Sequence, residues 1–218
     1  MPMNTASHLS YAVICLFAFG ILAALTANLR AQAPVTFFQQ ANAILADYST
    51  KGHQKAKGID MRLGYPKGWK ADEGDRPNVV QKFISPKGYA DGYLGITISN
   101  LPEELSDFDI KSMFVGNGPS AILPDGAKQL TRQNTKIEQI DADIRTYVLQ
   151  TERAGVKLSL FSHTLVFSIN RKLVVVNMTC GATGEVVDDA ALIQRGNLQS
   201  GLFRLCINTI VLASAWSP

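Results

Sequence analysis

The sequence predicts an α+β domain in which helices pack on an antiparallel sheet of six or seven strands, preceded by a hydrophobic N-terminal helix. Apolar residues recur at every second position in short runs bounded by tight turns, as in Ile59–Leu63 and Tyr93–Ser99. Near the two ends of the folded part, at Val35–Tyr48 and Asp188–Thr209, apolar residues instead recur every three or four positions, which indicates helices. Strands joined by tight turns pair antiparallel with their neighbours.

Composition and charge narrow the functional classes. The 218 residues are 46% hydrophobic and 18% charged, which is ordinary for a folded protein. About 180 residues follow the N-terminal segment, enough to bury a core without disulfides or metals. The formal net charge is +3, and the lysines and arginines are interleaved with acids. Because nucleic-acid-binding domains gather basic residues on one face, we expect no nucleic-acid partner.

The N-terminal segment contains an uncharged apolar run, Tyr11–Ala27, of 17 residues. This length is short for a membrane span and slightly long for a signal-peptide core, and the run has no polar face. We expect residues 1–33 to be a signal peptide or an N-terminal membrane anchor, with the membrane as a partner. Ala31-Gln32-Ala33 has the A-x-A pattern of a cleavage site, but Pro34 follows it directly, so cleavage stays open.

Two observations on the compartment conflict. The first ten residues contain no Lys or Arg while Arg30 follows the apolar run, which by the positive-inside rule favours a cytoplasmic domain. The export-like layout and the even pair Cys180 and Cys206, without C-x-x-C spacing, favour the opposite. We expect a periplasmic or extracytoplasmic domain that is either anchored at the inner membrane or secreted.

After the N-terminal segment, residues 34–57 are expected to form an amphipathic helix (Val35–Tyr48) and a polar linker, and residues 58–218 the folded domain. Asp141-Ala142-Asp143 is predicted to be a turn between two strands. Leu173–Cys180 is apolar on both faces and is predicted to be a central strand. The expected strands are Ile59–Leu63, Val79–Ile84, Tyr93–Ser99, Lys136–Ile140, Ile144–Glu152, Val156–Asn170 and Leu173–Cys180.

Two helices are expected within the domain. Ser106 can cap the first of them, and Asp107 and Asp109 suit the positive end of its dipole. The second, Asp188–Thr209, is expected to bury one apolar side, formed by Leu198, Leu202, Leu205 and Cys206. On this layout Cys180 ends a strand that the last helix covers, so a disulfide to Cys206 is plausible if the Cα atoms lie within about 7 Å. Two buried free thiols are the alternative.

The sequence contains no recognisable pattern of catalytic, cofactor-binding or metal-binding residues. The three histidines, His8, His53 and His163, have no metal-ligand spacing and no cysteine cluster beside them. Nucleophile-elbow, P-loop and dinucleotide-binding patterns are absent from the sequence. The paired acids fall at expected turns and helix starts. We expect a protein that is not an enzyme and has no cofactor. A hydrolase is the alternative, and it would need a concave pocket where His163 meets an acid or a serine.

The run Gly58–Trp69 (GIDMRLGYPKGW), a strand followed by Y-P-x-G-W, resembles the opening of the PsbP-like superfamily, which includes PsbP and DcrB-type envelope proteins. The likeness continues through Ser85-Pro86 to a last helix that ends in Phe203–Ile210, and it covers about residues 58–212. It implies an α/β/α sandwich around an antiparallel sheet and a non-enzymatic envelope protein that binds or supports a partner. The chain lacks an acylated leader cysteine and an evident metal-ligand set, so lipid anchoring and metal function do not carry over.

Tyr65 and Trp69 in this run are expected to cover the sheet edge, with ligand stacking as the sharper hypothesis. The leading hypothesis for the whole chain is a non-enzymatic envelope accessory protein that binds a protein partner or a small ligand. Besides the hydrolase, a structural subunit of a membrane-associated assembly is the alternative.

Overall fold

The computed structural model describes residues 36–89, 91–115 and 123–215. The chain divides into two compact units, residues 1–40 and 41–218, and of the first only residues 36–40 are described. The predicted signal peptide or anchor at residues 1–33 lies outside the described residues. Within the described ranges, no helix combines the length and the apolar character that a membrane crossing needs.

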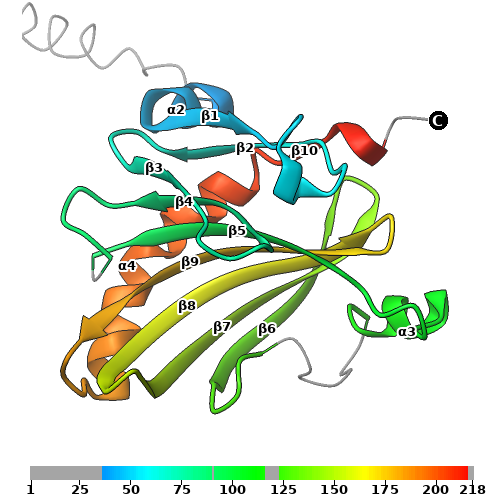
Figure 1. Cartoon of the computed structure of the whole chain (residues 1–218). Helices are drawn as coiled ribbons and strands as arrows, with labels where there is room; N and C mark the ends of the chain where they lie inside the picture. The colour runs from blue at the N-terminus through cyan, green and yellow to red at the C-terminus, as the bar shows by residue number, and fades with distance from the viewer. Residues whose placement is uncertain (1–35, 90, 116–122, 216–218) are drawn as a thin grey trace, which may run out of the picture. The chain divides into compact units, whose positions relative to one another are not determined.

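A seven-stranded antiparallel sheet forms most of the second unit, which confirms the predicted α+β class (Figure 1). Its strand order is β3-β4-β5-β9-β8-β7-β6, so the strand predicted to be central, β9, occupies the middle position. Its members are β3 (Lys70–Glu73), β4 (Val79–Ile84), β5 (Tyr93–Asn100), β6 (Lys128–Ile137), β7 (Ile140–Arg153), β8 (Val156–Ile169) and β9 (Lys172–Thr183).

A smaller sheet, in the order β1-β2-β10, consists of β1 (Leu45–Ser49), β2 (Met61–Pro66) and β10 (Val211–Leu212). The prediction of one helix over Val35–Tyr48 was wrong, because α2 (Phe37–Ile44) ends where β1 begins. Hydrogen-bonded pairing of all five β1 residues with β2 overrides the local helical spacing. Two short 3-10 helices, η1 (Gln54–Ala56) and η2 (Ala213–Ala215), complete this part.

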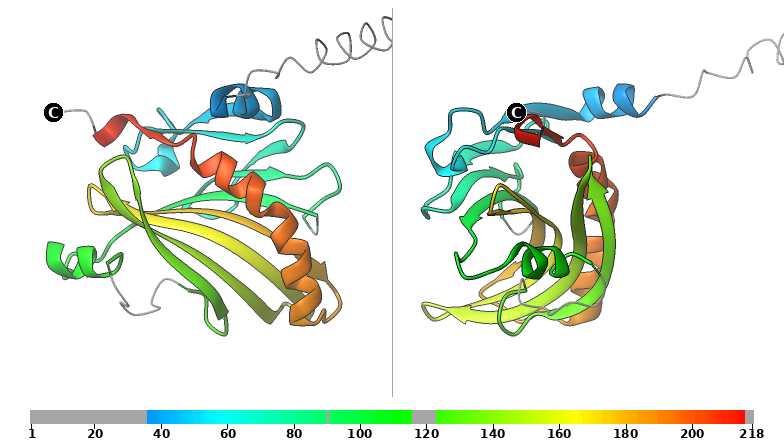
Figure 2. Two further views of the ribbon diagram at one scale, coloured as in Figure 1. Left: turned by 180° about the vertical axis from the view of Figure 1, so that it is seen from behind. Right: turned by 90° about the vertical axis from the view of Figure 1, so that its right-hand side faces the viewer.

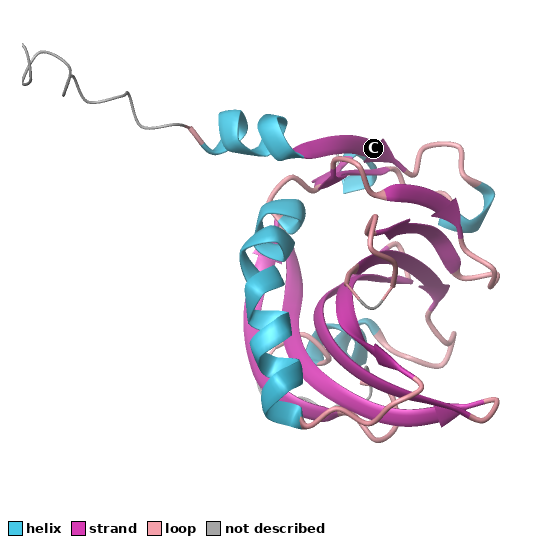
Figure 3. Ribbon diagram, turned by 90° about the vertical axis from the view of Figure 1, so that its left-hand side faces the viewer, coloured by secondary structure: helices cyan, strands magenta, loops and turns pink. Residues whose placement is uncertain are grey.

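The long helix α4 (Asp189–Ile207) lies along one face of the large sheet, which we call the α4 face (Figures 2 and 3). Asp188 caps the helix as the sequence suggested, with its carboxylate accepting from the Ala190 and Ala191 N–H groups. The α4 side chains Phe203, Cys206 and Ile207 pack into the main core, together with apolar residues of β2, β5, β8 and β9.

Leu198 does not join this core, and its predicted burial was wrong. The helix buries Leu192, Gly196 and Phe203, whereas Leu198 is 84% exposed. Leu198 follows Gly196 by two residues, which places it about 200° around the helix from the buried side. Gly196 lies so close to the Phe161 ring of β8 that a Cβ atom at this position would overlap it. Glycine therefore sets how closely α4 approaches the sheet.

A short helix, α3 (Asp107–Ser112), packs on the opposite face, with Ile110 and Phe114 against Val166 of β8. Figure 2 shows α3 and α4 on the two sides of the sheet, as in the α/β/α arrangement predicted. The predicted cap is confirmed: the Ser106 hydroxyl accepts from the Asp109 N–H, and the Asp109 carboxylate accepts from the Ser106 N–H.

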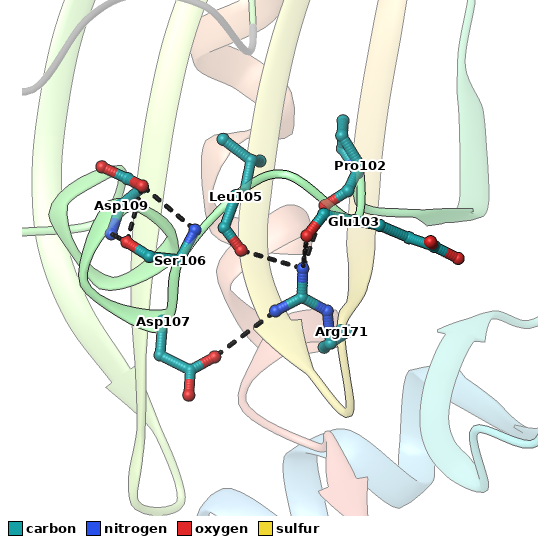
Figure 4. A network of polar contacts seen from close by, with 7 residues as sticks. All are labelled: Pro102, Glu103, Leu105, Ser106, Asp107, Asp109 and Arg171. Atoms are coloured by element: carbon teal, nitrogen blue, oxygen red, sulfur yellow. Dashed lines mark hydrogen bonds and ion pairs between the residues drawn. The ribbon is translucent and has the colours of Figure 1, made fainter.

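Arg171, in the turn between β8 and β9, fastens the loop that leads into α3 (Figure 4). Its guanidinium donates to the carbonyl oxygens of Pro102, Glu103 and Leu105 at 3.0, 3.2 and 2.9 Å. It also lies 3.5 Å from the Asp107 carboxylate. Several neutral acceptors and one carboxylate on the same guanidinium hold the loop and the helix start to the hairpin.

Candidate ligand-binding site

The face of the large sheet away from α4, which we call the open face, carries polar side chains in register on neighbouring strands. In the first row, Tyr147 of β7 is paired with Ser162 of β8, Ser162 with Thr179 of β9, and Thr179 with Tyr93 of β5. Side chains of directly paired residues point to the same face. The four polar groups therefore form a continuous row across the sheet.

The next row is also polar and crosses five strands. It runs through Arg145, Thr164, Asn177, Gly95 and Lys82, each paired with the next. Gly95 has a spatial role here, because a Cβ atom at this position would overlap the Tyr93 hydroxyl and lie 2.8 Å from the Asn177 side-chain oxygen. The missing side chain lets the Tyr93 and Asn177 groups approach each other above the sheet.

A cavity of about 430 Å³ lies over these rows. At its polar end the lining includes Lys82, Tyr93, Tyr147, Ser162, Asn177 and Thr179. At its apolar end the lining consists of Leu149, Leu158 and Leu160, with Thr151 beside Leu158. This volume lies in the range of small-molecule sites, which combine apolar walls with a few convergent polar groups. The cavity therefore has the size and the lining of a site for a small ligand.

A chain of neutral hydrogen-bonding groups forms the floor of the polar end. The Ser162 hydroxyl lies 2.9 Å from the Thr179 hydroxyl. It also lies 3.3 Å from the hydroxyl of Thr164, a buried residue that does not itself line the cavity. The Asn177 side-chain amide donates to the Thr179 hydroxyl at 3.1 Å. Because a hydroxyl can rotate to donate or to accept, this floor can match either kind of group on a ligand.

Lys82 is the cationic group of the cavity, and its charge is already matched. Its side chain is 10% exposed, and its Nζ lies 2.9 Å from the carboxylate of Asp75 and 3.6 Å from that of Asp72. The hydrogen bond to Asp75 raises the pKa of Lys82, so the ammonium stays charged. Burial raises the pKa of Tyr93 to about 12, so its phenol stays protonated at neutral pH.

Next to the two polar rows, the Asp143 carboxylate binds the guanidinium groups of Arg132 and Arg145. Its Oδ2 accepts from Arg132 Nε at 2.7 Å and from Arg145 Nε and Nη2 at 2.9 and 2.7 Å. Asp143 Oδ1 and Arg145 Nη1 have no hydrogen-bond partner among the described residues. Arg132 also donates to the Met113 carbonyl at 3.1 Å, which ties the end of α3 to the sheet.

The prediction of a turn at Asp141-Ala142-Asp143 was wrong. Ile137 pairs with Ile140, so the turn is Glu138-Gln139, and Asp143 lies fully buried inside β7. The buried position is tolerated because two guanidinium groups compensate the Asp143 carboxylate.

A second cavity, of about 330 Å³, lies between α4 and the β6–β7 end of the sheet and includes His163. His163 is 7% exposed, and its Nε2 lies 3.1 Å from the Gly196 carbonyl oxygen. Its ring lies 4.9 Å from that of Phe161 and is stacked on Phe203 at 5.4 Å. Burial lowers the pKa of His163. Within the described ranges, no hydrogen bond joins His163 to an acid or a serine, as the hydrolase alternative requires.

Tyr65 and Trp69 lie away from both cavities. The Tyr65 ring is stacked on Phe83, with centroids 4.0 Å apart and planes at 16°. Trp69 packs partly buried against the main core, close to Gly92. The structure thus gives both side chains a packing role, and ligand stacking by them stays a prediction.

The predicted disulfide is not formed, because Cys180 and Cys206 are both free and buried. Cys180 belongs to a cluster with Leu192 near the start of α4, whereas Cys206 belongs to the main core. Leu192 and Cys206 are fourteen residues apart on α4, which is about 21 Å along a helix axis. Burial raises the pKa of the Cys180 thiol to about 11 and that of Cys206 to about 12, so both thiols are poorly reactive.

No group of three or more His, Cys, Asp or Glu side chains that could hold a metal ion is found in the described part of the chain.

The residues of the open-face cavity were not predicted from the sequence. Asn177 and Thr179 lie two apart in a strand predicted to be apolar on both faces, although side chains two apart share a face. The same spacing joins Ser162 to Thr164 and Arg145 to Tyr147. The polar alternation was therefore a usable signal, but only strand register shows that the polar positions meet.

The chain is similar to several solved structures at low sequence identity. No protein-family model matches the chain, and no curated protein is similar to it. Among solved structures, it is similar to cyanobacterial PsbP (CyanoP) from Synechocystis sp. PCC 6803, with 16% identity, a TM-score of 0.47, and coverage of 85% of this chain and 99% of that chain.

Two further solved structures are similar to the chain. LpqN, involved in cell envelope biogenesis of Mycobacterium tuberculosis, has 12% identity and a TM-score of 0.43 over 83% of this chain and 99% of that one. The Ran-binding protein Mog1p of Saccharomyces cerevisiae has 8% identity and a TM-score of 0.46 over 77% and 96%. The PsbP-like resemblance noted in the sequence agrees with the first of these likenesses. All of them concern the fold, and the function is argued from the residues of this chain.

Proposed function

We propose that this protein is a non-enzymatic accessory protein of the cell envelope that binds a small ligand in the open-face cavity. The observation that carries the proposal is the pair of polar rows across the open face, beneath a cavity of about 430 Å³. The opposite face of the same strands forms the main core with α4. The open-face groups beneath the cavity, such as Ser162 and Asn177, therefore stand outside the main core.

The proposal of binding without turnover is supported by the chemistry of the floor. Its hydroxyl and amide groups bond to one another, as Ser162 does to Thr179. A nucleophile would need an adjacent base to activate it. The charged pair Lys82 and Asp75 neutralise each other at 2.9 Å. These groups are suited to orient a bound molecule.

A neutral fluorescent dye, Nile red, tests ligand binding in this cavity. We expect its emission to rise and shift to the blue on titration with the full chain, and the signal to saturate at one dye per protein. Leu160→Gln, which makes the apolar wall polar at similar size, is expected to weaken binding about tenfold, equal to about 1.4 kcal/mol.

Leu130→Gln, the same change at a leucine that lines the second cavity, is the matched control and should leave dye binding unchanged. Thermal unfolding of each variant verifies that it is folded. No saturable binding by the folded wild-type chain would contradict the proposal, as would equal effects of the two substitutions.

The location outside the cytoplasm is supported by the apolar run Tyr11–Ala27. A C-terminal fusion of the full chain to alkaline phosphatase, which is active only after export, tests it. We expect an active reporter, and we expect the activity to disappear when residues 1–33 are deleted. An inactive phosphatase together with a fluorescent cytoplasmic fusion would contradict this location.

A further inference from the structure

We infer that the ligand of the open-face cavity is an uncharged amphiphile, with a hydroxyl-rich head at the polar end and an alkyl-like body at the apolar end. This inference rests on the function proposed above and specifies its ligand. It follows from the order of side chains along the strands, from the charges at the cavity and from the hydrogen bonds of its floor.

The apolar end continues directly from the polar end along the same strands. Leu149 of β7 pairs with Leu160 of β8, one row beyond the pair Tyr147 and Ser162. Leu158 extends the wall by another row. From Leu158 to Ser162 the strand advances four residues, or about 13 Å. An extended chain of eight carbons with a compact head fits a site of this length.

The charges at the polar end disfavour an ionic head. Lys82 is the cation of this end, and it lies between the carboxylates of Asp75 and Asp72. A ligand carboxylate would have to displace Asp75 from the ammonium, while a ligand cation would meet the ammonium itself. The Asp75 side chain is 89% exposed, so displacing it costs little in itself, but the two carboxylates still repel an anionic head and the ammonium repels a cationic one. An uncharged head leaves the pair intact.

The hydrogen bonds of the floor favour a head with several hydroxyls. Ser162 and Thr179 provide two hydroxyls that bond to each other at the cavity, and Asn177 adds an amide. The Tyr93 phenol, which burial keeps protonated, is a further donor. Each hydroxyl can exchange its bond to a neighbour for a bond to a ligand hydroxyl without leaving a buried group unpaired. A sugar-like head satisfies this pattern.

Three probes with the same eight-carbon tail test the inference: n-octyl β-D-glucoside, octanoate and octyltrimethylammonium. Each competes with Nile red on the full chain, below its critical micelle concentration. We expect the glucoside to displace the dye at a concentration at least about tenfold lower than either charged probe. Since the tails are identical, the difference reports on the head.

Asn177→Ala is expected to weaken binding of the glucoside about tenfold and to change binding of Nile red by less than about a factor of two. Asn197→Ala, the same change in the second cavity, is the matched control and should affect neither. If Asn177→Ala does not fold, Ser162→Ala takes its place.

The outcomes separate the ligand class from the function. Stronger competition by octanoate or by the ammonium probe would contradict the inference that the head is uncharged, but not the proposal that the cavity binds a ligand. Binding of Nile red without competition by any of the three probes would contradict the inference that the ligand is an amphiphile. Failure of Nile red itself to bind overturns the proposed function. Equal glucoside affinity in the Asn177 variant and its control overturns the placement of the head.

Discussion

The two faces of the large sheet are built from the same strands and differ in what they do with their side chains. On the α4 face, Ile96, Leu165 and Val176 are fully buried. Their neighbours in the sequence lie on the open face: Gly95 and Thr97 flank Ile96, Thr164 precedes Leu165, and Asn177 follows Val176. Because side chains alternate between faces, the core and the polar rows share one register. One face of the sheet therefore secures the fold, while part of the other face lines the cavity.

Two glycines show the same difference between the core on the α4 face and the candidate site on the open face. Gly196 permits close packing of α4 on Phe161, whereas Gly95 makes room for Tyr93 and Asn177 in the polar rows. In both places the missing side chain allows a close approach, but the first serves the core and the second serves the candidate site.

The largest loss of stability is expected at Asp143. This residue lies on the open-face side of the sheet and is nevertheless fully buried. Asp143→Asn leaves Arg132 and Arg145 as buried cations without their shared carboxylate. We expect the free energy of unfolding to fall by about 3–5 kcal/mol. Urea unfolding measures it.

Asp141→Asn is the matched control, since the Asp141 carboxylate lies 3.7 Å from a largely exposed Lys136. We expect a change of less than about 1 kcal/mol there. Similar losses for the two substitutions would show that the buried cluster does not stabilise the sheet as described.

The second prediction concerns the close approach of α4 to the sheet at Gly196. Gly196→Ala introduces a Cβ atom against the buried ring of Phe161, and we expect a loss of about 1–3 kcal/mol despite the better helix propensity of alanine. Gly201→Ala, at an exposed position of α4 with nothing within 4 Å, should instead stabilise the protein by about 0.5–1 kcal/mol. Thermal or urea unfolding gives both values. Changes of the same sign would contradict the described approach of helix and sheet.

The smallest effect is on pH dependence and again concerns the α4 face. Burial lowers the pKa of His163 in the folded state, whereas in the unfolded chain the imidazole takes up a proton near its ordinary pKa of about 6.5. Below that pH the unfolded state binds more protons, so the free energy of unfolding decreases as the pH falls through about 6.5.

We expect this decrease to be smaller in His163→Gln, which keeps a side-chain donor for the Gly196 carbonyl. Urea unfolding of both proteins at pH 7.5 and 5.5 provides the comparison. An unchanged pH dependence in the variant would show that His163 is not the group that titrates.

The fold was largely readable from the sequence where local and tertiary preferences agree. The start of α3 followed from Ser106 and Asp109, because a capping box is a local signal. The central strand β9 followed from its continuous apolar run. The end of α2 did not, since Leu45 leaves the helix to pair with Pro66 of β2, a partner outside the local sequence pattern.

The candidate site could not be read in the same way. Ser162, Asn177 and Lys82 belong to three strands, and their meeting depends on the register of pairs between them. Asp143 was predicted to lie in a turn because Asp141-Ala142-Asp143 separates two runs that were expected to be strands, Lys136–Ile140 and Ile144–Glu152. The two arginines that compensate the Asp143 carboxylate come from β6 and β7, and no local sequence pattern predicts that they meet it.

Leucine-methyl NMR of the full chain titrated with n-octyl β-D-glucoside tests the central claim most directly. The leucines of the cavity, Leu149, Leu158 and Leu160, report on the open face, and Leu165 and Leu192 report on the α4 face. We predict saturable shifts of the first three methyl groups and little change in the other two. Shifts centred on the α4-face leucines, or no saturable shift at any of the five, would contradict a ligand site on the open face.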